Sequence, residues 1–310
     1  MDYLESLPCP ALRRGEDPYM NRRMSALLGK EEALLLAGSV TPGETKTVMI
    51  GGAPYGAELS PEGVFLLFAR KEREAEEDAV PANTAASLRS ALTSAVAVAS
   101  ALRRGTDPVS RRYAGILSRS VDQIVRISDN LRTASLKSWD AMHTENLAAV
   151  LKEIADQINY YLGKEDAVIL ETEPGDPSLI CSRELIASLV MNLTVEALLA
   201  SEETVTLRLR PGKTFAMDFL TASGEGRREF FEKMLFEEDG CGTGFASIRK
   251  AVALHEGSLF LLEEGEKLVI HVALSRSLRP GADAFAPESV YQGGDYVYMM
   301  LSPLKSRRER

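Results

Sequence analysis

The fold of this chain is decided by the stretch Gly242-Thr243-Gly244-Phe245-Ala246-Ser247-Ile248-Arg249-Lys250-Ala251-Val252-Ala253-Leu254-His255-Glu256-Gly257. Its glycine-rich turn leads into an apolar run, which predicts a helix over 246–255. Glycines let a ligand approach the backbone closely, and a helix N-terminus favours negative charge. Two interpretations therefore stand: a plain structural turn, or a nucleotide or anion contact through Gly242, Thr243 and Gly244.

Outward from this turn, segment 141–277 mixes helical and strand patterns. Apolar residues recur at helical spacing over 147–162 and 183–200, and Ser182 stands where an N-cap is expected. Short apolar runs predict strands over 168–171, 258–262 and 267–275, and a pair of neighbouring strands over 205–209 and 215–220. This order predicts an α+β sandwich, with helices covering one face of one sheet.

Segment 141–277 resembles the catalytic domain of bacterial sensor histidine kinases, whose GHKL-type ATPase fold is shared with gyrase and Hsp90-type ATPases. The block through Leu254-His255-Glu256-Gly257 makes the match more specific than a glycine turn alone. The resemblance implies that the backbone of the Gly242–Gly244 turn faces the phosphates of ATP.

A second block, Glu184 to Ala197, resembles the asparagine box of that family. The family has two asparagines four residues apart, and the second helps to hold Mg²⁺. Here Asn192 is kept and Glu196 stands in the second place. The resemblance implies nucleotide and Mg²⁺ binding by this pair; structural hydrogen bonding is the equally weighted alternative.

A third block departs from the family. Where histidine kinases have Asp-x-Gly-x-Gly, with Asp reading the adenine amino group, this chain has Ala222-Ser223-Gly224-Glu225-Gly226. Losing a charged hydrogen bond of this kind removes about 1.5–3 kcal/mol, so we expect ATP binding to be weak or absent. Gly224 and Gly226 stay candidate nucleotide-binding residues, whereas Asp218 is too far along the strand to substitute.

Segment 71–140 contains a helical hairpin with apolar seams. The second helix is predicted to start at Asp107-Pro108, because Asp is a good N-cap and Pro fits the first helical position. Its seam consists of Val109, Tyr113, Ile116, Ser120, Ile124, Ile127, Leu131 and Ala134. Two helices bury only one stripe each, so we expect residues 79–138 of two chains to form a dimeric four-helix bundle.

This hairpin resembles the dimerisation and phosphotransfer domain of histidine kinases, whose first helix begins His-Glu-Leu-Arg-Thr-Pro-Leu. The stretch Leu88 to Ser94 aligns with the later part of that motif, which puts Ala86 at the phospho-acceptor position. Alanine has no nucleophilic nitrogen and cannot carry phosphate. No catalytic residue is therefore assigned.

The two ends of the chain carry weaker patterns. Residues 1–70 loosely resemble a trimmed PAS sensor domain, a small α/β unit, with no haem or flavin signature. Residues 278–310 read as a C-terminal tail, partly extended or loose.

Composition narrows the class of protein. A formal net charge of −9 argues against nucleic-acid binding. No apolar stretch is long enough for a membrane span, and the three cysteines lack metal-ligand spacing, so we expect a cytoplasmic protein.

Three hypotheses follow for the function. The first is a non-autophosphorylating histidine kinase homologue, acting as regulator or scaffold on a response regulator or partner kinase. The second is a divergent ATP-binding kinase or ATPase that phosphorylates another protein. The third is a small-molecule sensor that works through the PAS-like unit.

Overall fold

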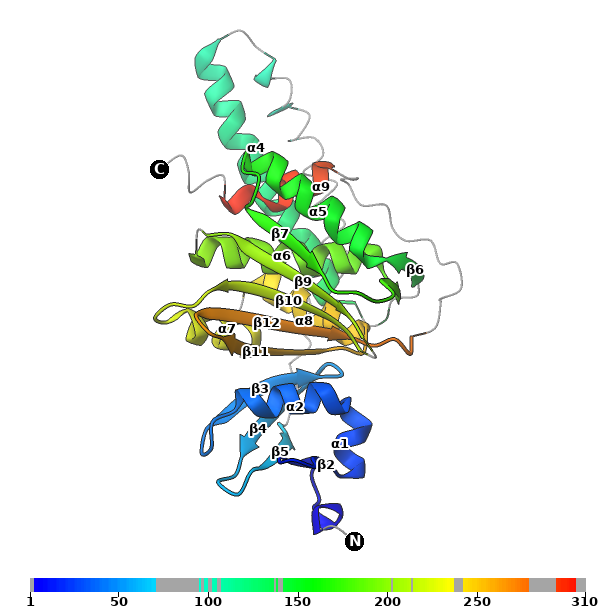
Figure 1. The fold of residues 1–310 in the computed structure, drawn as a ribbon. Helices are drawn as coiled ribbons and strands as arrows, with labels where there is room; N and C mark the ends of the chain where they lie inside the picture. The colour runs from blue at the N-terminus through cyan, green and yellow to red at the C-terminus, as the bar shows by residue number, and fades with distance from the viewer. Residues whose placement is uncertain are drawn as a thin grey trace.

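The computed structural model describes residues 3–70, 95, 98–99, 102–104, 107–136, 138, 142–201, 203–212, 214–236, 242–278 and 294–304. Its strands form a ten-stranded sheet in the order β2-β1-β5-β4-β3-β11-β12-β10-β9-β7, and a two-stranded sheet of β6 and β8 (Figure 1). The mixture of helices with a mostly antiparallel sheet confirms the α+β class.

The bounds of the elements are as follows. The strands are β1 (Ala11–Arg13), β2 (Tyr19–Met20), β3 (Thr45–Ile50), β4 (Ala53–Leu59), β5 (Val64–Ala69), β6 (His143–Asn146), β7 (Val168–Thr172), β8 (Ser178–Cys181), β9 (Val205–Pro211), β10 (Phe215–Ala222), β11 (Ser258–Glu264) and β12 (Lys267–Leu274). The helices are η1 (Tyr3–Ser6), α1 (Arg22–Leu27), α2 (Lys30–Ser39), α4 (Pro108–Ala134), α5 (Leu147–Leu162), α6 (Arg183–Ser201), α7 (Arg227–Phe236), α8 (Thr243–Leu254) and α9 (Gly294–Met300).

The N-terminal unit consists of β1 to β5 with α1 and α2. Asn21 begins α1 as its N-cap, accepting hydrogen bonds from the N–H groups of Met24 and Ala11. Its amide also donates to the Leu4 and Cys9 carbonyls, so one buried side chain joins the start of the chain to α1.

The N-terminal sheet continues directly into the C-terminal sheet. β3 pairs with β11 in the register Ile50↔Ser258 and Met49↔Leu259, and the Gly51 N–H donates to the Gly257 carbonyl at 2.9 Å. Gly52 follows with φ +83°, where an added Cβ would lie 2.6 Å from that of Ala253 on α8. The N-terminal unit therefore packs tightly on the strand and helix that follow the Gly242 turn.

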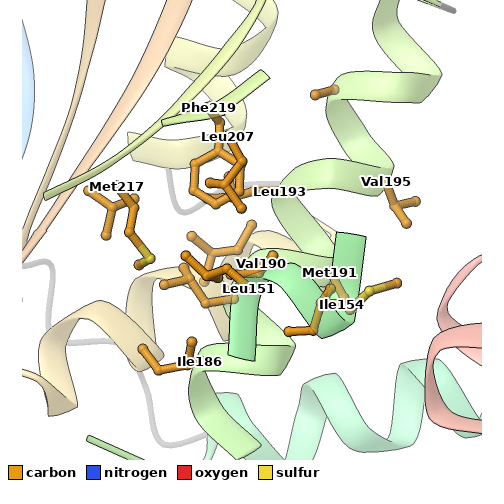
Figure 2. Close-up of a cluster of buried hydrophobic side chains, with 14 of the residues drawn as sticks. Leu151, Ile154, Ile186, Val190, Met191, Leu193, Val195, Leu207, Met217 and Phe219 are labelled. Atoms are coloured by element: carbon orange, nitrogen blue, oxygen red, sulfur yellow. The ribbon is translucent and has the colours of Figure 1, made fainter. Parts of the chain in front are cut away.

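The C-terminal sheet is covered on one face by α5, α6 and α8. Figure 2 shows part of this core, in which Leu151 of α5, Val190 of α6 and Phe219 of β10 lie among other apolar side chains. α5 has an apolar face and ends at Gly163 in the left-handed conformation. The bounds of α5 are those predicted, and Ser182 caps α6 by accepting from the Leu185 N–H.

The other face of the C-terminal sheet is not left to solvent. α2 packs against β11, and Phe260 and Val269 share a core with Leu36 of α2. Helices of two sequence regions thus sandwich the same strands, which explains the apolar character of both faces of β11 and β12.

α4 is a 27-residue helix that begins as predicted, with Asp107 accepting from the Val109 and Ser110 N–H groups. It packs against α8 and α9, and Figure 1 shows it extending away from the sheets. Most of the predicted first helix of the hairpin, including Ala86 and Leu88 to Ser94, lies outside the described residues; its described residues 95, 98–99 and 102–103 are helical.

We expected no apolar stretch long enough for a membrane span, but α6 is long and apolar enough to cross one, with a mean hydropathy of 1.5 over its best window. In this fold 67% of that window is buried inside the protein. Its composition is accounted for by its place between the sheet and the other helices.

The C-terminal tail differs from expectation. We expected it to be extended or loose, but α9 packs against α4, α5 and α6, with Val297, Met299, Met300 and Leu301 buried. Its apolar run of alternating aromatic and aliphatic residues is too short for a helical period to be recognised in the sequence.

Candidate functional site

Asn192 and Glu196 lie one turn apart on α6, as their spacing predicted. His255 fixes the start of that helix: its Nδ1 lies 2.7 Å from the Ala251 carbonyl, and its Nε2 accepts from the Ser182 N–H at 3.2 Å. The ring is thus the neutral tautomer protonated at Nδ1. Burial lowers the pKa of His255, which favours the same state.

The glycine turn lies beside α6. Gly242 is the N-cap of α8, and Gly244 approaches Asn192 so closely that an added Cβ would lie 3.0 Å from its Oδ1. Ser188 and Ser247 hydroxyls, 3.1 Å apart, join α6 to α8 nearby. The absence of a side chain at position 244 therefore allows the two helices to meet at Asn192.

A pocket of about 250 Å³ opens between α4, α6 and the start of α8. It brings together four of the predicted residues, Glu196, Gly242, Thr243 and Gly244, with side chains of α4 that sequence reasoning had not placed there. The remaining lining residues are Gln123, Arg126, Ile127, Asn130 and Pro303.

Asn192 itself is fully buried and makes a reciprocal amide pair with Asn130 of α4. The Asn192 Nδ2 donates to the Asn130 Oδ1 at 2.8 Å, and the Asn130 Nδ2 donates back to the Asn192 Oδ1 at 3.2 Å. The Asn192 Nδ2 also donates to the Ser188 carbonyl at 3.0 Å. The polar atoms of this amide are thus all satisfied within the protein.

Glu196 is paired with a cation from α4. The Arg126 Nη2 lies 3.1 Å from the Glu196 Oε1 and 3.3 Å from the Asn192 Oδ1. A second ion pair, Arg132 with Glu184, joins the same two helices further along. These contacts cover the face of α6 that was expected to meet a nucleotide and its metal.

α9 adds a third layer over α6. Its Tyr296 hydroxyl is buried near Ser188, Asp129, Arg132 and Arg126. Burial of the hydroxyl and the negative charge of Asp129 raise the pKa of Tyr296, so the phenol stays protonated at physiological pH.

The end of β10 carries the third predicted block. Gly226 has φ +74°, and the Arg227 guanidinium folds back over Gly224 and donates to the Ala222 carbonyl at 2.6 Å. Gly224 and Gly226 do not line the pocket at Gly242–Gly244. The structure therefore does not bring these glycines together with the other candidates.

Asp218 takes no part in this site. Its carboxylate lies 2.6 Å from the His271 Nδ1 and 2.7 Å from the Arg210 guanidinium, while Phe260 stacks on the imidazole. Burial alone would raise the pKa of Asp218, but His271 and Arg210 outweigh it and hold the pKa below its usual range. This cluster faces α2, where Glu32 bonds to Ser258.

These residues do not fit Mg·ATP in the arrangement seen. Asn192 is buried in an amide pair, Glu196 is neutralised by Arg126, and Ala222 offers no carboxylate. Within the described ranges no group of three or more His, Cys, Asp or Glu side chains is placed to hold a metal. An Mg²⁺ ion would need the carboxylate that Arg126 already holds.

Sequence reasoning missed Arg126, Asn130 and Tyr296. Polar residues on the side of an amphipathic helix away from its apolar stripe are normally solvated, so Arg126 and Asn130 gave no local sign of burial. Their role becomes visible only through their partners: Asn130 contacts Asn192, 62 residues further along the chain, and Arg126 contacts Glu196, 70 residues further along.

No protein-family model matches this chain, and no curated protein matches its sequence. Among solved structures, full-length ShkA in complex with AMPPNP is similar at 15% identity and a TM-score of 0.50; the match covers 67% of this chain and 46% of ShkA. The Acinetobacter baumannii histidine kinase AdeS matches at 12% identity and a TM-score of 0.42, over 62% of this chain and 97% of AdeS.

The histidine kinase ThkA, in complex with response regulator protein TrrA, matches at 14% identity and a TM-score of 0.43, over 89% of this chain and 98% of that one. At these identities the likeness concerns the fold. The chain has a histidine kinase-like fold.

Proposed function

We propose that this chain is a histidine kinase-like signal-transduction protein that does not phosphorylate itself and acts as a regulator or scaffold in a two-component pathway. The observation that carries the proposal is the burial of Asn192 against Asn130, with Arg126 on Glu196. The face of α6 that would meet a nucleotide is occupied by the protein's own helix. Ala86 and Ala222 support the same conclusion from the sequence.

The surface through which two chains would pair is the apolar stripe of α4. Its large members Val109, Tyr113, Ile116, Ile124 and Ile127 are between 40% and 64% exposed. Buried residues of α4, such as Val121 and Val125, lie on its other side, against the catalytic domain. We propose that the stripe pairs two chains through residues 79–138, and that the outer surface of that bundle binds a response regulator or partner kinase.

Sedimentation equilibrium tests the pairing. Ile116→Asp and Ile124→Asp place carboxylates in the stripe and are expected to convert a dimer into a monomer. Arg111→Asp, on the other side of α4 by helical spacing, is the matched control and should stay dimeric. A wild-type chain that sediments as a monomer at tens of micromolar would refute the pairing.

Incubation with labelled ATP and Mg²⁺ tests the absence of self-phosphorylation. We expect no acid-labile phosphate on the wild-type chain, and none on Ala86→His, because restoring the histidine does not uncover Asn192. An active sensor histidine kinase treated in parallel supplies the positive control. Acid-labile label on either chain would overturn the proposal.

The second candidate is a divergent ATP-binding kinase or ATPase acting on another protein. The observation in its favour is the pocket of about 250 Å³ at the Gly242–Gly244 turn, in a fold that holds AMPPNP in ShkA. Under this hypothesis Asn192, Glu196 and the turn bind weakly held Mg·ATP. Titration calorimetry with ATP, with and without Mg²⁺, separates the two: heat that depends on Mg²⁺ favours the second.

We place the protein in the cytoplasm, without nucleic-acid partners. The net charge of −9 supports the second part of this proposal, because the phosphate backbone of a nucleic acid binds clustered Lys and Arg side chains rather than acidic surfaces. The PAS-like assignment of residues 1–70 is supported by the strand order β2-β1-β5-β4-β3.

A further inference from the structure

The C-terminal segment 294–304 lies where three helices meet. α9 contacts α4, α5 and α6, and Val297, Met299, Met300 and Leu301 are at most 3% exposed. Tyr298 packs edge-on against Tyr161 of α5, with ring centroids 5.4 Å apart. A segment of this length is thus anchored mainly by apolar side chains.

The contact that α4 makes by itself is of a different kind. Its buried residues before position 126 are Ala114, Val121 and Val125, but from position 128 onward they are Ser128, Asp129, Asn130 and Thr133. Hydrogen bonds formed on docking largely replace bonds to water, so polar contacts contribute little net stability. The last third of α4, residues 126–134, therefore has no fully buried apolar side chain of its own to hold it on the catalytic domain.

α9 supplies that surface at the place where α4 lacks it. Tyr296 lies near Ser188, Asp129 and Arg132, beside the polar junction that Asn130 and Asn192 form. Pro303, just after α9, lines the pocket together with Arg126 and Asn130. The segment thus contacts both sides of the α4–α6 junction.

We propose that residues 294–304 are an intramolecular latch that holds the last third of α4, residues 126–134, against α6 and α8. While the latch is docked, Asn192 and Glu196 stay covered. Its release frees α4 from the catalytic domain and makes that face of α6 accessible. The latch is independent of the proposed function, because it requires no nucleotide and no phosphoryl transfer.

Hydrogen exchange followed by mass spectrometry tests the latch. In a chain ending at residue 293, amides of 120–134 should exchange at least tenfold faster than in the full chain, while those of β9 and β10 keep their protection. A chain ending at residue 304 is the matched control and should exchange like the full chain. A peptide of residues 294–310, added in excess to the shortened chain, should restore the slow exchange.

A second variant covers the case in which the shortened chain does not fold. Val297→Asp in the full chain puts a carboxylate at a position that is 3% exposed, whereas Phe68→Asp, on β5 of the N-terminal unit, puts one at a position that is 40% exposed. We expect faster exchange of 120–134 in the first and no change in the second. Exchange within twofold of wild type in a folded chain ending at 293, or in Val297→Asp, overturns the proposal. No nucleotide is present, so this outcome is separate from that of the labelled-ATP experiment.

Discussion

Replacing the amide pair of Asn130 and Asn192 by leucine tests whether α4 is docked on α6 in solution. Leucine has nearly the shape of asparagine but cannot form the hydrogen bonds of 2.8 and 3.2 Å that join the two side chains. Each such bond contributes about 0.5–1.5 kcal/mol net, and a buried partner left unsatisfied adds to the loss. The pair should therefore show a coupling free energy of about 2 kcal/mol.

Urea unfolding of four chains measures this coupling: wild type, Asn130→Leu, Asn192→Leu and the double variant. Each single variant should lose stability, with Asn192→Leu losing more because its bond to the Ser188 carbonyl also disappears. The double variant should be more stable than the sum of the single losses implies. A coupling free energy below about 0.5 kcal/mol would refute the docked arrangement, since independent sites add within that margin.

Three further predictions concern contacts that hold separate elements of the fold together. Gly52→Ala should lower the free energy of unfolding by more than about 2 kcal/mol, because φ is +83° and the new Cβ would lie 2.6 Å from that of Ala253. Arg210→Met should lower it by about 2–3 kcal/mol, since Asp218 stays buried while the Arg210 side chain is only 31% exposed. The pKa of His255 is lowered in the folded state, so the free energy of unfolding should fall as the pH drops below about 6.5, where the unfolded chain binds the proton.

A control variant tests each of these three predictions, with the free energy of unfolding measured in urea. Gly51→Ala, with φ +58° and no neighbouring atom within 4 Å, should show only the backbone cost of about 1–2 kcal/mol; equal losses would contradict the contact with α8. Arg208→Met removes ion pairs to carboxylates that are more than half exposed and should lose less than about 1 kcal/mol. For the pH effect, His255→Gln should weaken the fall in the free energy of unfolding below about pH 6.5, whereas the exposed variant His143→Gln should leave that fall unchanged. The reverse result would assign the pH dependence to a group other than His255.

Local patterns were sufficient to predict most of the helices and strands that the structure describes between residues 107 and 277. The apolar period over Leu147–Leu162, the Asp107-Pro108 start and the Ser182 cap act within a few residues, so each could be predicted and was found. The pairing of the strands around 205–209 and 215–220 was also predicted, and β9 pairs with β10. A short connection makes antiparallel pairing the simplest topology there.

The continuation of the N-terminal sheet into β11 could not be predicted. Only two residues of β3 pair with β11, and nothing in Met49-Ile50 distinguishes them from any other apolar strand end. The decisive contacts join side chains that are far apart in sequence, such as Glu32 with Ser258. An acidic residue in the first turn of a helix is normally explained by the helix dipole, so its burial gave no local sign.

The candidate site divides in the same way. The sequence alone determined that Asn192 and Glu196 share a helical face and that Gly242–Gly244 opens a helix, because these statements need only helical periodicity and residue chemistry. That Ala86 and Ala222 stand at the phospho-acceptor and adenine-binding positions stays a prediction from the resemblance to histidine kinases.

Only the tertiary structure decided what the site contacts. It placed Arg126 on Glu196 and Asn130 on Asn192, and it docked a C-terminal segment, expected to be loose, beside them. Ion pairs and amide pairs between helices leave no period in the sequence, because either partner alone looks like an ordinary solvated residue. Their energy exists only when packing removes both from water, and that is a property of the assembled fold.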